Sequence, residues 1–135
     1  MNRTPVFPTT SARVLRDPSF HDSLIYAIAL DDDSKHRSLV VKIRDCNDMP
    51  FEIYLSDLRH LRLDRFLTQN VIYELELVAA REVEDGYLEE FISTMKVQDL
   101  HAAAIADELL YFAIIPANGC SLRALCKDVL FYQMK

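Results

Sequence analysis

Glycine is scarce in this sequence, and Gly86 and Gly119 are the only two among 135 residues. Loops that cradle a phosphate need several glycines, because a backbone without Cβ atoms can approach the ligand closely. Walker-type and dinucleotide-binding loops are therefore excluded. Tryptophan is absent, and three unevenly spaced cysteines are too few for a zinc knuckle or a disulfide framework.

Long apolar runs are also missing. The longest, residues 109–115, is far shorter than a membrane span, and the N-terminal residues lack the apolar core of a secretory signal. We therefore expect a cytoplasmic protein with no membrane partner. The length and the globular composition fit a single domain, predicted over residues 19–135 after a loosely ordered lead-in over residues 1–18.

The net charge of −6 resides in one stretch, residues 81–108, where Arg81 and Lys96 are the only bases beside eight acidic residues. Nucleic acid is a poor partner for such a chain. The stretch is either a solvated surface or a face that binds a basic protein partner. The candidate partner-binding residues are Glu82, Glu84, Asp85, Glu89, Glu90 and Asp99.

Apolar patterning predicts strands in the first half of the chain. Residues 24–30 are nearly all apolar, which predicts a strand that is covered on both faces. Residues 39–55 alternate in two runs around a turn, which predicts a hairpin whose outer face places Glu52 near Lys42.

Further strands and helices are predicted after this hairpin. A short strand covers residues 60–63. Residues 70–80 fit a strand or a helix, and their Val, Ile and Tyr content favours the strand. Residues 87–105 have helical apolar spacing. We predict an α+β fold, with a mainly antiparallel, meander-like sheet, one or two helices between residues 87 and 108 packed on one face, and a C-terminal β-hairpin.

Asn118 and Gly119 predict the two-residue turn of that hairpin, because both residue types accept positive φ. This turn sets a register in which Ala113 lies opposite Ala124, with an apolar face toward the core. The last two cysteines share the second strand and lie about 20 Å apart at the usual rise. They are therefore too distant for a disulfide, and we expect buried free thiols.

His21, Asp22 and Ser23 have the residue types of a hydrolytic triad. Three consecutive side chains cannot align as nucleophile, base and orienting group, and no glycine is available for a nucleophile elbow. We interpret the stretch as a turn before a strand, with Phe20 in the core and Asp22 accepting hydrogen bonds from backbone donors. We predict no catalytic residues. An alternative hypothesis gathers His21, Asp22, His60 and Tyr54 into a pocket.

Arg59, His60, Arg62 and Arg65 form a local basic patch. It predicts either a site for an anion or an acidic partner, or a charged sheet edge that resists strand pairing. No metal site is predicted, because the aspartates at 31–33 lack the ligand spacing of a calcium loop and the histidines lack zinc-type spacing. We expect no cofactor.

Four segments carry a resemblance over roughly residues 19 to 131: FHDS before a strand, LVVKIRD with FEIYLSDLRHLRLDRF, QNVIYELEL, and YFAIIPANGCSLRALCKDV. Together they resemble a loose group of small bacterial proteins, mostly uncharacterised, some of which are assigned as immunity proteins of polymorphic toxin systems. At the final turn the group often has Pro-Ser-Tyr-Gly, where this chain has Pro-Ala-Asn-Gly. The resemblance implies no catalytic residues.

We therefore expect a non-catalytic protein-binding module, and the resemblance implies an immunity-type protein that occludes a toxin. Two alternatives stay open. One is the small-ligand-binding protein or enzyme with the four-residue pocket above, and the other is a structural subunit that dimerises through a strand edge. We expect a monomer or a weak homodimer.

Overall fold

The computed structural model describes residues 3–5, 20–33, 36–83, 88, 90–91 and 108–134. The described residues form nine strands, which pair into one antiparallel sheet in the order β1-β9-β4-β3-β2-β6-β7-β8-β5. The strands are β1 (Arg3–Pro5), β2 (Leu24–Asp33), β3 (His36–Arg44), β4 (Pro50–Ser56), β5 (His60–Asp64), β6 (Asn70–Ala79), β7 (Leu110–Asn118), β8 (Ser121–Cys126) and β9 (Asp128–Met134), and a 3₁₀ turn, η1 (Ala80–Glu82), follows β6.

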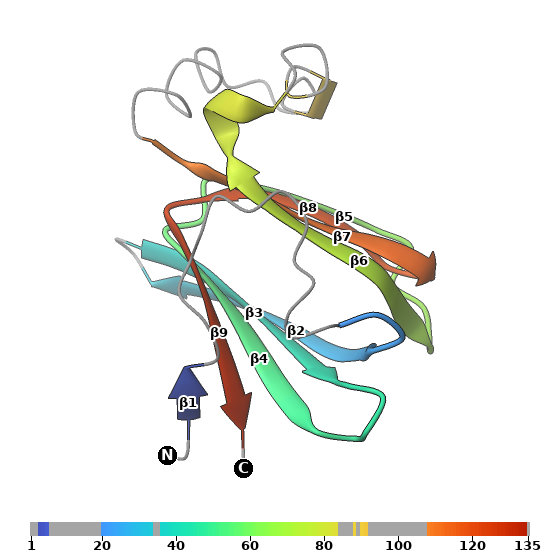
Figure 1. Ribbon diagram of the computed structural model, residues 1–135. Helices are drawn as coiled ribbons and strands as arrows, with labels where there is room; N and C mark the ends of the chain where they lie inside the picture. Colours follow the sequence, from blue (N-terminus) through green and yellow to red (C-terminus); the bar gives the residue numbers. More distant parts are fainter. Residues whose placement is uncertain are drawn as a thin grey trace.

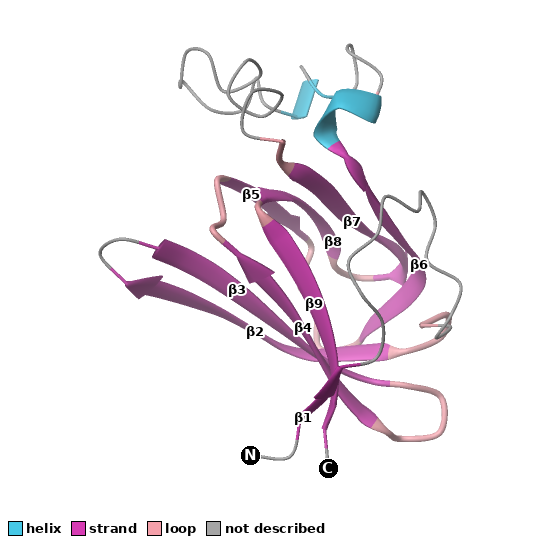
Figure 2. Cartoon of the chain, turned by 60° about the vertical axis from the view of Figure 1, so that its left-hand side comes forward, coloured by secondary structure: helices cyan, strands magenta, loops and turns pink. Residues whose placement is uncertain are grey.

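The sheet bends into two layers that pack face to face, as Figures 1 and 2 show. The first layer holds β1, β9, β4, β3 and β2, and the second holds β6, β7, β8 and β5. Within the described residues, β6 pairs with β2 at one corner only, through Leu24 with Val71 and Ile25 with Asn70. A single residue, Lys127, separates β8 from β9 where the chain crosses between layers. The result is a β-sandwich built from one continuous sheet.

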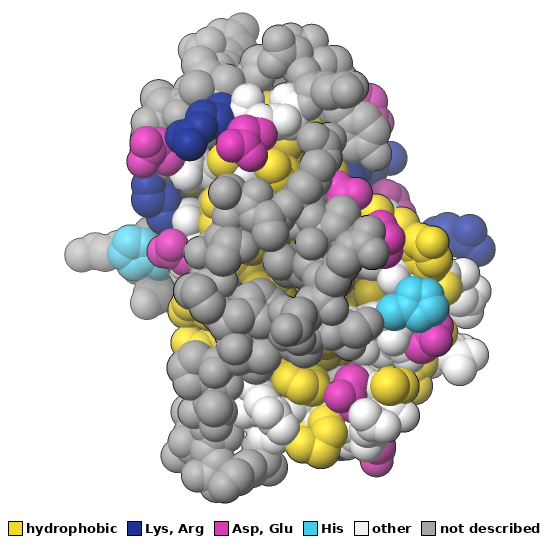
Figure 3. Space-filling model, in the orientation of Figure 1, with side chains coloured by type: hydrophobic (Ala, Val, Ile, Leu, Met, Phe, Trp, Pro, Cys, Tyr) yellow, Lys and Arg dark blue, Asp and Glu magenta, His cyan; other side chains and the backbone are white. Residues whose placement is uncertain are grey.

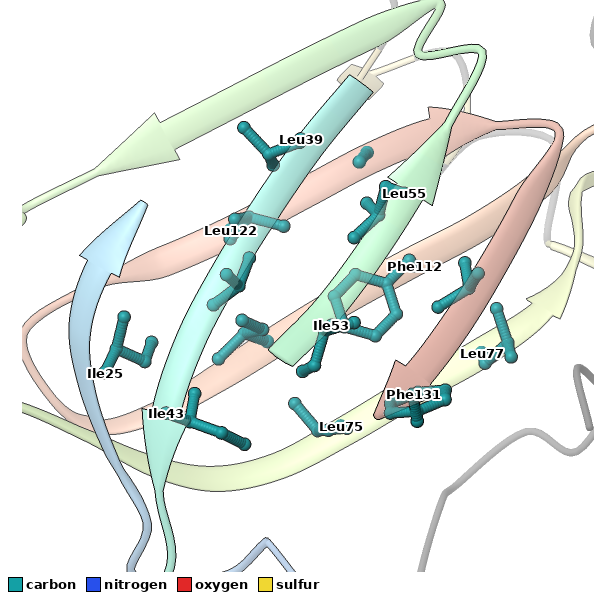
Figure 4. Packing of buried hydrophobic residues seen from close by; sticks show 14 of the residues in the cluster. Ile25, Leu39, Ile43, Ile53, Leu55, Leu75, Leu77, Phe112, Leu122 and Phe131 are labelled. Carbon is teal, nitrogen blue, oxygen red and sulfur yellow. The ribbon is translucent and has the colours of Figure 1, made fainter. Parts of the chain in front are cut away.

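The core lies between the two layers. Leu39, Val41 and Ile43 alternate along β3 and are all buried, because successive strand residues point to opposite faces. In Figure 4 they are met by side chains from the other layer: Leu75, Leu77, Phe112 and Leu122. The rings of Phe112 and Phe131 meet edge to face with their centroids 6.4 Å apart, which joins the layers.

The predicted α+β fold is wrong, because the second layer is made of strands. We predicted that helices pack on one face of the sheet. The inner face of the first layer packs instead against β6, β7 and β8. Since the hairpin strands already cover this face, the core needs no helical layer. Within the segment 87–108, helical backbone among the described residues is limited to positions 88, 90 and 91, and the rest up to residue 107 lies outside the described residues.

The hairpin predicted over residues 39–55 is confirmed. β3 and β4 pair with Lys42 opposite Glu52. Residues 70–79, for which a strand was favoured over a helix, form β6. Within the predicted lead-in, β1 pairs with β9, so the two ends of the described chain lie side by side (Figure 1). The remainder of the lead-in is outside the described residues.

The prediction that the first long strand is covered on both faces is wrong. In β2, Leu24, Tyr26 and Leu30 are 40%, 49% and 55% exposed. A bulge lies between Ile25 and Ala27. The pairing of β2 with β6 is limited to Leu24 and Ile25, and the remainder of β6 belongs to the second layer. The apolar run of β2 is therefore only partly buried. Ile25 lies in the core, whereas Leu24, Tyr26 and Leu30 are exposed.

The C-terminal hairpin is confirmed, but its predicted register is wrong by one residue. Ala113 lies opposite Arg123 rather than Ala124. Gly119 has a φ of 81°, whereas Asn118 is not among the described residues with positive φ. A slip of one residue turns the side chains of one strand to the other face. Ala113 and its alternate neighbours on β7 therefore face outward.

A smaller apolar cluster covers one end of the outer face of the second layer. Leu88 and Phe91 pack there against Val78, Tyr111 and Leu125. Each of these five side chains is buried. The cluster places the neighbouring Glu90 beside the outer face of β8, where it meets basic side chains.

Candidate functional site

The stretch from His21 to Ser23 is a turn, as predicted, and not a triad. The Ser23 amide donates to the Phe20 carbonyl at 3.0 Å, and Phe20 is buried. The side chains of His21 and Asp22 are exposed and 3.1 Å apart, whereas Ser23 is fully buried. In the described part of the chain its hydroxyl has no hydrogen-bond partner. The three groups therefore do not line up for nucleophilic catalysis.

The prediction that Asp22 accepts hydrogen bonds from backbone donors is wrong among the described residues, because its carboxylate lies beside His21 Nδ1. Asp22 instead supports this turn through its backbone. Its φ is 66°, in the left-handed region that aspartate tolerates better than most residues. Its amide donates to the Ile72 carbonyl at 2.9 Å, and the Ile72 amide donates to the Ser23 carbonyl at 2.9 Å. The turn thereby fastens the start of β2 to β6.

The four residues of the alternative pocket are not brought together. His60 lies on the outer face of the second layer, where its Nε2 donates to the Phe91 carbonyl at 3.1 Å. Tyr54 lies on the outer face of the first layer, opposite Leu130. His21 contacts Tyr73 near the corner between layers. None of the four lines either cavity described below.

The predicted basic patch is largely neutralised by neighbouring carboxylates. Arg59 Nη2 lies 3.0 Å from Asp57 Oδ2. Arg62 Nε lies 3.0 Å from Asp64 Oδ2, and its Nη1 lies 3.6 Å from Glu90 Oε1. Two arginines of the patch thus already hold carboxylates, which weakens the interpretation as an anion site.

The other two residues of the patch differ from each other. Arg65 is exposed and has a φ of 59° just after β5. His60 is buried, and this burial is the largest cause of its lowered pKa. The hydrogen bond to the Phe91 carbonyl raises the pKa, and the positive charges of Arg123 and Arg62 lower it further. His60 therefore packs as a neutral ring.

The predicted acidic face is only partly described. Glu82 is exposed on η1. Glu90 accepts a hydrogen bond from Arg123 Nη1 at 3.0 Å, and this bond, with the charges of Arg123 and Arg62, lowers the pKa of Glu90. The other candidate residues lie outside the described residues: Glu84, Asp85, Glu89 and Asp99.

The aspartates at 31–33 are the last residues of β2, and they pair with residues 36–38 of β3. They are therefore strand residues. In the part of the chain that the structure describes, no three His, Cys, Asp or Glu residues form a group that could hold a metal ion.

The edge of β2 is the first of two surface features suited to binding. Beyond Ile25, residues 26–33 pair with β3 on one side and with no described strand on the other. Residues 66–70, which lead from β5 to β6, lie beside the near end of this edge at residues 24–26, where Asn70 pairs with Ile25.

We call this edge, together with the chain segment that leads to it, the open seam and define it by residues 24–33 and 61–67. Six large hydrophobic side chains there are 40–55% exposed: Leu24, Tyr26, Leu30, Leu63, Phe66 and Leu67. Ile28 and Leu61 connect the open seam to the core. A cavity of about 180 Å³ lies at its near end, between the start of β2 and residues 66–70.

The second feature is a cavity of about 380 Å³ on the outer face of the second layer, which we call the outer groove. Glu76 on β6 and Arg123 on β8 flank the small side chain of Ala113 on β7. The residues that line it are Glu76, Glu90, Tyr111, Ala113, Ile114, Ile115, Pro116, Ser121 and Arg123.

Sequence reasoning missed both features. Leu30 is part of an apolar run that is typical of a buried strand. Phe66 and Leu67 are adjacent apolar residues in a loop, a signal of surface exposure that could have been noticed. Glu76 and Arg123 come from strands whose register is set by long-range contacts, so no local pattern places them on one groove.

Comparison of the chain with protein-family models, with curated proteins and with solved structures gave no match. Within the described residues, no helix has both the length and the apolar character needed to cross a membrane.

Proposed function

We propose that this protein is a non-catalytic protein-binding module that takes an extended segment of a partner along the open seam. One observation carries the proposal: among the described residues the edge of β2 beyond Ile25 pairs with no second strand, and apolar side chains of β2 are exposed there. An edge strand offers backbone donors and acceptors to an added strand, and alternate side chains of that strand can fill apolar pockets. Contiguous apolar surface of this kind typically marks an interaction site.

The charge of the chain indicates what the partner segment carries. Asp31, exposed at the far end of the open seam, forms no ion pair with the described residues. Asp31 begins a run of three aspartates at residues 31–33. A segment with alternating apolar residues and a basic residue near Asp31 fits this edge, and opposite charge on the two proteins speeds their association. On the face seen in Figure 3, carboxylates and exposed hydrophobic side chains are interspersed.

An immunity-type protein that occludes a basic toxin, as the resemblance implies, is one form of this function. The acidic net charge and the open seam support it. A cytoplasmic location belongs to the same proposal, and it is supported by three cysteines that are free thiols, as cysteines are in a reducing compartment.

A photo-crosslinking residue at position 30 provides the test. The protein is crosslinked in a lysate of the cells that make it, and the crosslinked partner segment is synthesised as a peptide and titrated against the purified chain. Leu30→Lys places a charge in the open seam, so we expect it to weaken binding roughly tenfold or more. Leu130→Lys is the matched control, because Leu130 is 39% exposed on the outer face of the first layer.

The proposal is overturned if both variants bind the peptide as well as the wild type does, or lose affinity equally. If the crosslinked partner is a second copy of this chain, light scattering decides between the hypotheses. A dimer that Leu30→Lys dissociates would replace the proposed module with the structural subunit that pairs through its strand edge.

A further inference from the structure

We infer that the outer groove binds the side chain of a lysine presented by a peptide, with Glu76 holding the ammonium group. The outer groove is built on β6, β7 and β8, whereas the open seam is built on β2 and β5. The inference therefore does not depend on the function proposed above.

The strand registers place the two charged walls of the groove. Glu76, Ala113, Arg123 and Arg62 form one row across β6, β7, β8 and β5. Adjacent strands lie about 4.8 Å apart, so the backbones of β6 and β8 are roughly 10 Å apart across this row. Because Ala113 has only a methyl group, the space between the walls stays open.

The arginine wall is already neutralised. Arg123 Nη1 donates to Glu90 at 3.0 Å, and its guanidinium carbon lies 5.0 Å from the centroid of the Phe91 ring. Arg62 contacts Asp64 at 3.0 Å and Glu90 at 3.6 Å. Two carboxylates thus balance the two guanidinium groups, and this wall does not favour an anion.

The opposite wall carries negative charge that nothing in the described residues balances. Glu74 and Glu76 lie on the outer face of β6, and neither forms a hydrogen bond or an ion pair with the described residues. Glu76 is half-buried, so an ion pair with it would be screened less by water than a pair at a fully exposed site. The groove therefore favours a cation.

The apolar floor of the groove favours a cation with an aliphatic chain. Ile115 and Pro116 line the groove next to Glu76, and this apolar surface can pack the methylene stem of a lysine whose head reaches the carboxylate. The cavity of about 380 Å³ is larger than one lysine side chain, which leaves room for flanking peptide backbone. Ser121, at the wall of the groove, offers that backbone a hydroxyl.

The experiment titrates the protein with Nα-acetyl-lysine N-methylamide and follows the amide spectrum by NMR. We expect saturable shifts of residues around Glu76 and Ala113, with an affinity that falls as salt is added. Glu76→Gln should weaken binding about fivefold, the loss expected for one partly exposed ion pair. Glu82→Gln removes the same charge from the exposed η1 and should leave the affinity unchanged.

Equal affinities of the wild type and Glu76→Gln would overturn the inference, as would equal binding of Nα-acetyl-glutamate N-methylamide. Cadaverine, an amine without a peptide backbone, is titrated in parallel. Tighter binding of cadaverine than of the lysine amide would overturn the assignment to a peptide. Leu30→Lys should retain lysine binding, so failure of the outer groove and failure of the open seam are distinguishable.

Discussion

His60 is a histidine that the fold buries and keeps neutral. Its Nε2 donates to the Phe91 carbonyl, and its ring lies against the Phe91 ring with the centroids 4.4 Å apart. A proton on the second ring nitrogen would add a buried charge near Arg123 and Arg62. Burial is the main reason that the pKa of His60 lies below its ordinary value.

We predict that acid destabilises the protein through this residue. Because its pKa is lower in the folded than in the unfolded chain, the unfolded chain takes up the proton first. The free energy of unfolding should then fall as the pH drops below about 6.5, the ordinary histidine value. Urea unfolding at several pH values measures this fall.

His60→Gln is the informative variant, because an amide can still donate to the Phe91 carbonyl but does not titrate. Its free energy of unfolding should depend less on pH than that of the wild type between about pH 6.5 and 5. Parallel pH curves for the two proteins would show that His60 is not the group responsible.

At the scale of single residues, local chemistry predicted part of what is observed. Phe20 is buried and the cysteines are free, as expected. Burial raises the pKa of Cys120 to about 11, which suits an inert thiol. The environment of His60 was not predictable, because its partner Phe91 lies 31 positions away in the sequence.

At the scale of elements, side-chain hydrogen bonds join the start of β6 to the turn of the C-terminal hairpin at one corner. Asn70 Oδ1 accepts hydrogen bonds from the amides of Leu67 and Cys120, and its Nδ2 donates to the Leu67 carbonyl. A Cβ on Gly119 would lie 2.5 Å from Asn70 Oδ1 and 2.8 Å from the Gln69 carbonyl oxygen. Only glycine fits this turn without displacing the corner.

We predict that Asn70→Ala lowers the free energy of unfolding by about 2 kcal/mol, because it leaves the buried Cys120 amide without its partner and removes two bonds to Leu67. Asn118→Ala is the control. It removes an exposed hydrogen bond of 3.2 Å to the Gln69 carbonyl, so its cost should be clearly smaller. Urea unfolding measures both, and equal costs would mean that Asn70 does not hold the corner.

This corner also explains why the hairpin was predicted with the wrong register. Asn118 and Gly119 correctly indicated a turn, since that signal is local. The register is supported by the contact of Cys120 with Asn70, which lies 50 positions earlier in the chain. A pattern within the hairpin carries no information about such a contact.

The whole molecule depends on one core shared by two layers. Strand pairing between the layers is confined, in the described residues, to the corner of β2 and β6. Phe131 spans the interior, with its ring centroid 5.9 Å from that of Phe20 and 6.4 Å from that of Phe112. Packing, rather than hydrogen bonding, therefore holds the layers together over most of their area.

We predict that Phe131→Ala lowers the free energy of unfolding by roughly 3–5 kcal/mol, as loss of a large core side chain does. Leu130→Ala, at the adjacent and exposed position, should cost less than about 1 kcal/mol. Urea unfolding followed by far-ultraviolet circular dichroism tests this. Two separate transitions would show that the layers unfold independently.

The sequence by itself determined where most strands form and that the thiols stay unpaired, because alternation and spacing are local properties of the chain. The tertiary structure decided that strands form the second layer, that β2 keeps an exposed edge, and that Arg123 and Glu76 flank one groove. It also decided that Glu90, predicted as a partner-binding acid, pairs with Arg62 and Arg123. Each of these outcomes depends on contacts between residues far apart in the chain, which local patterning cannot specify.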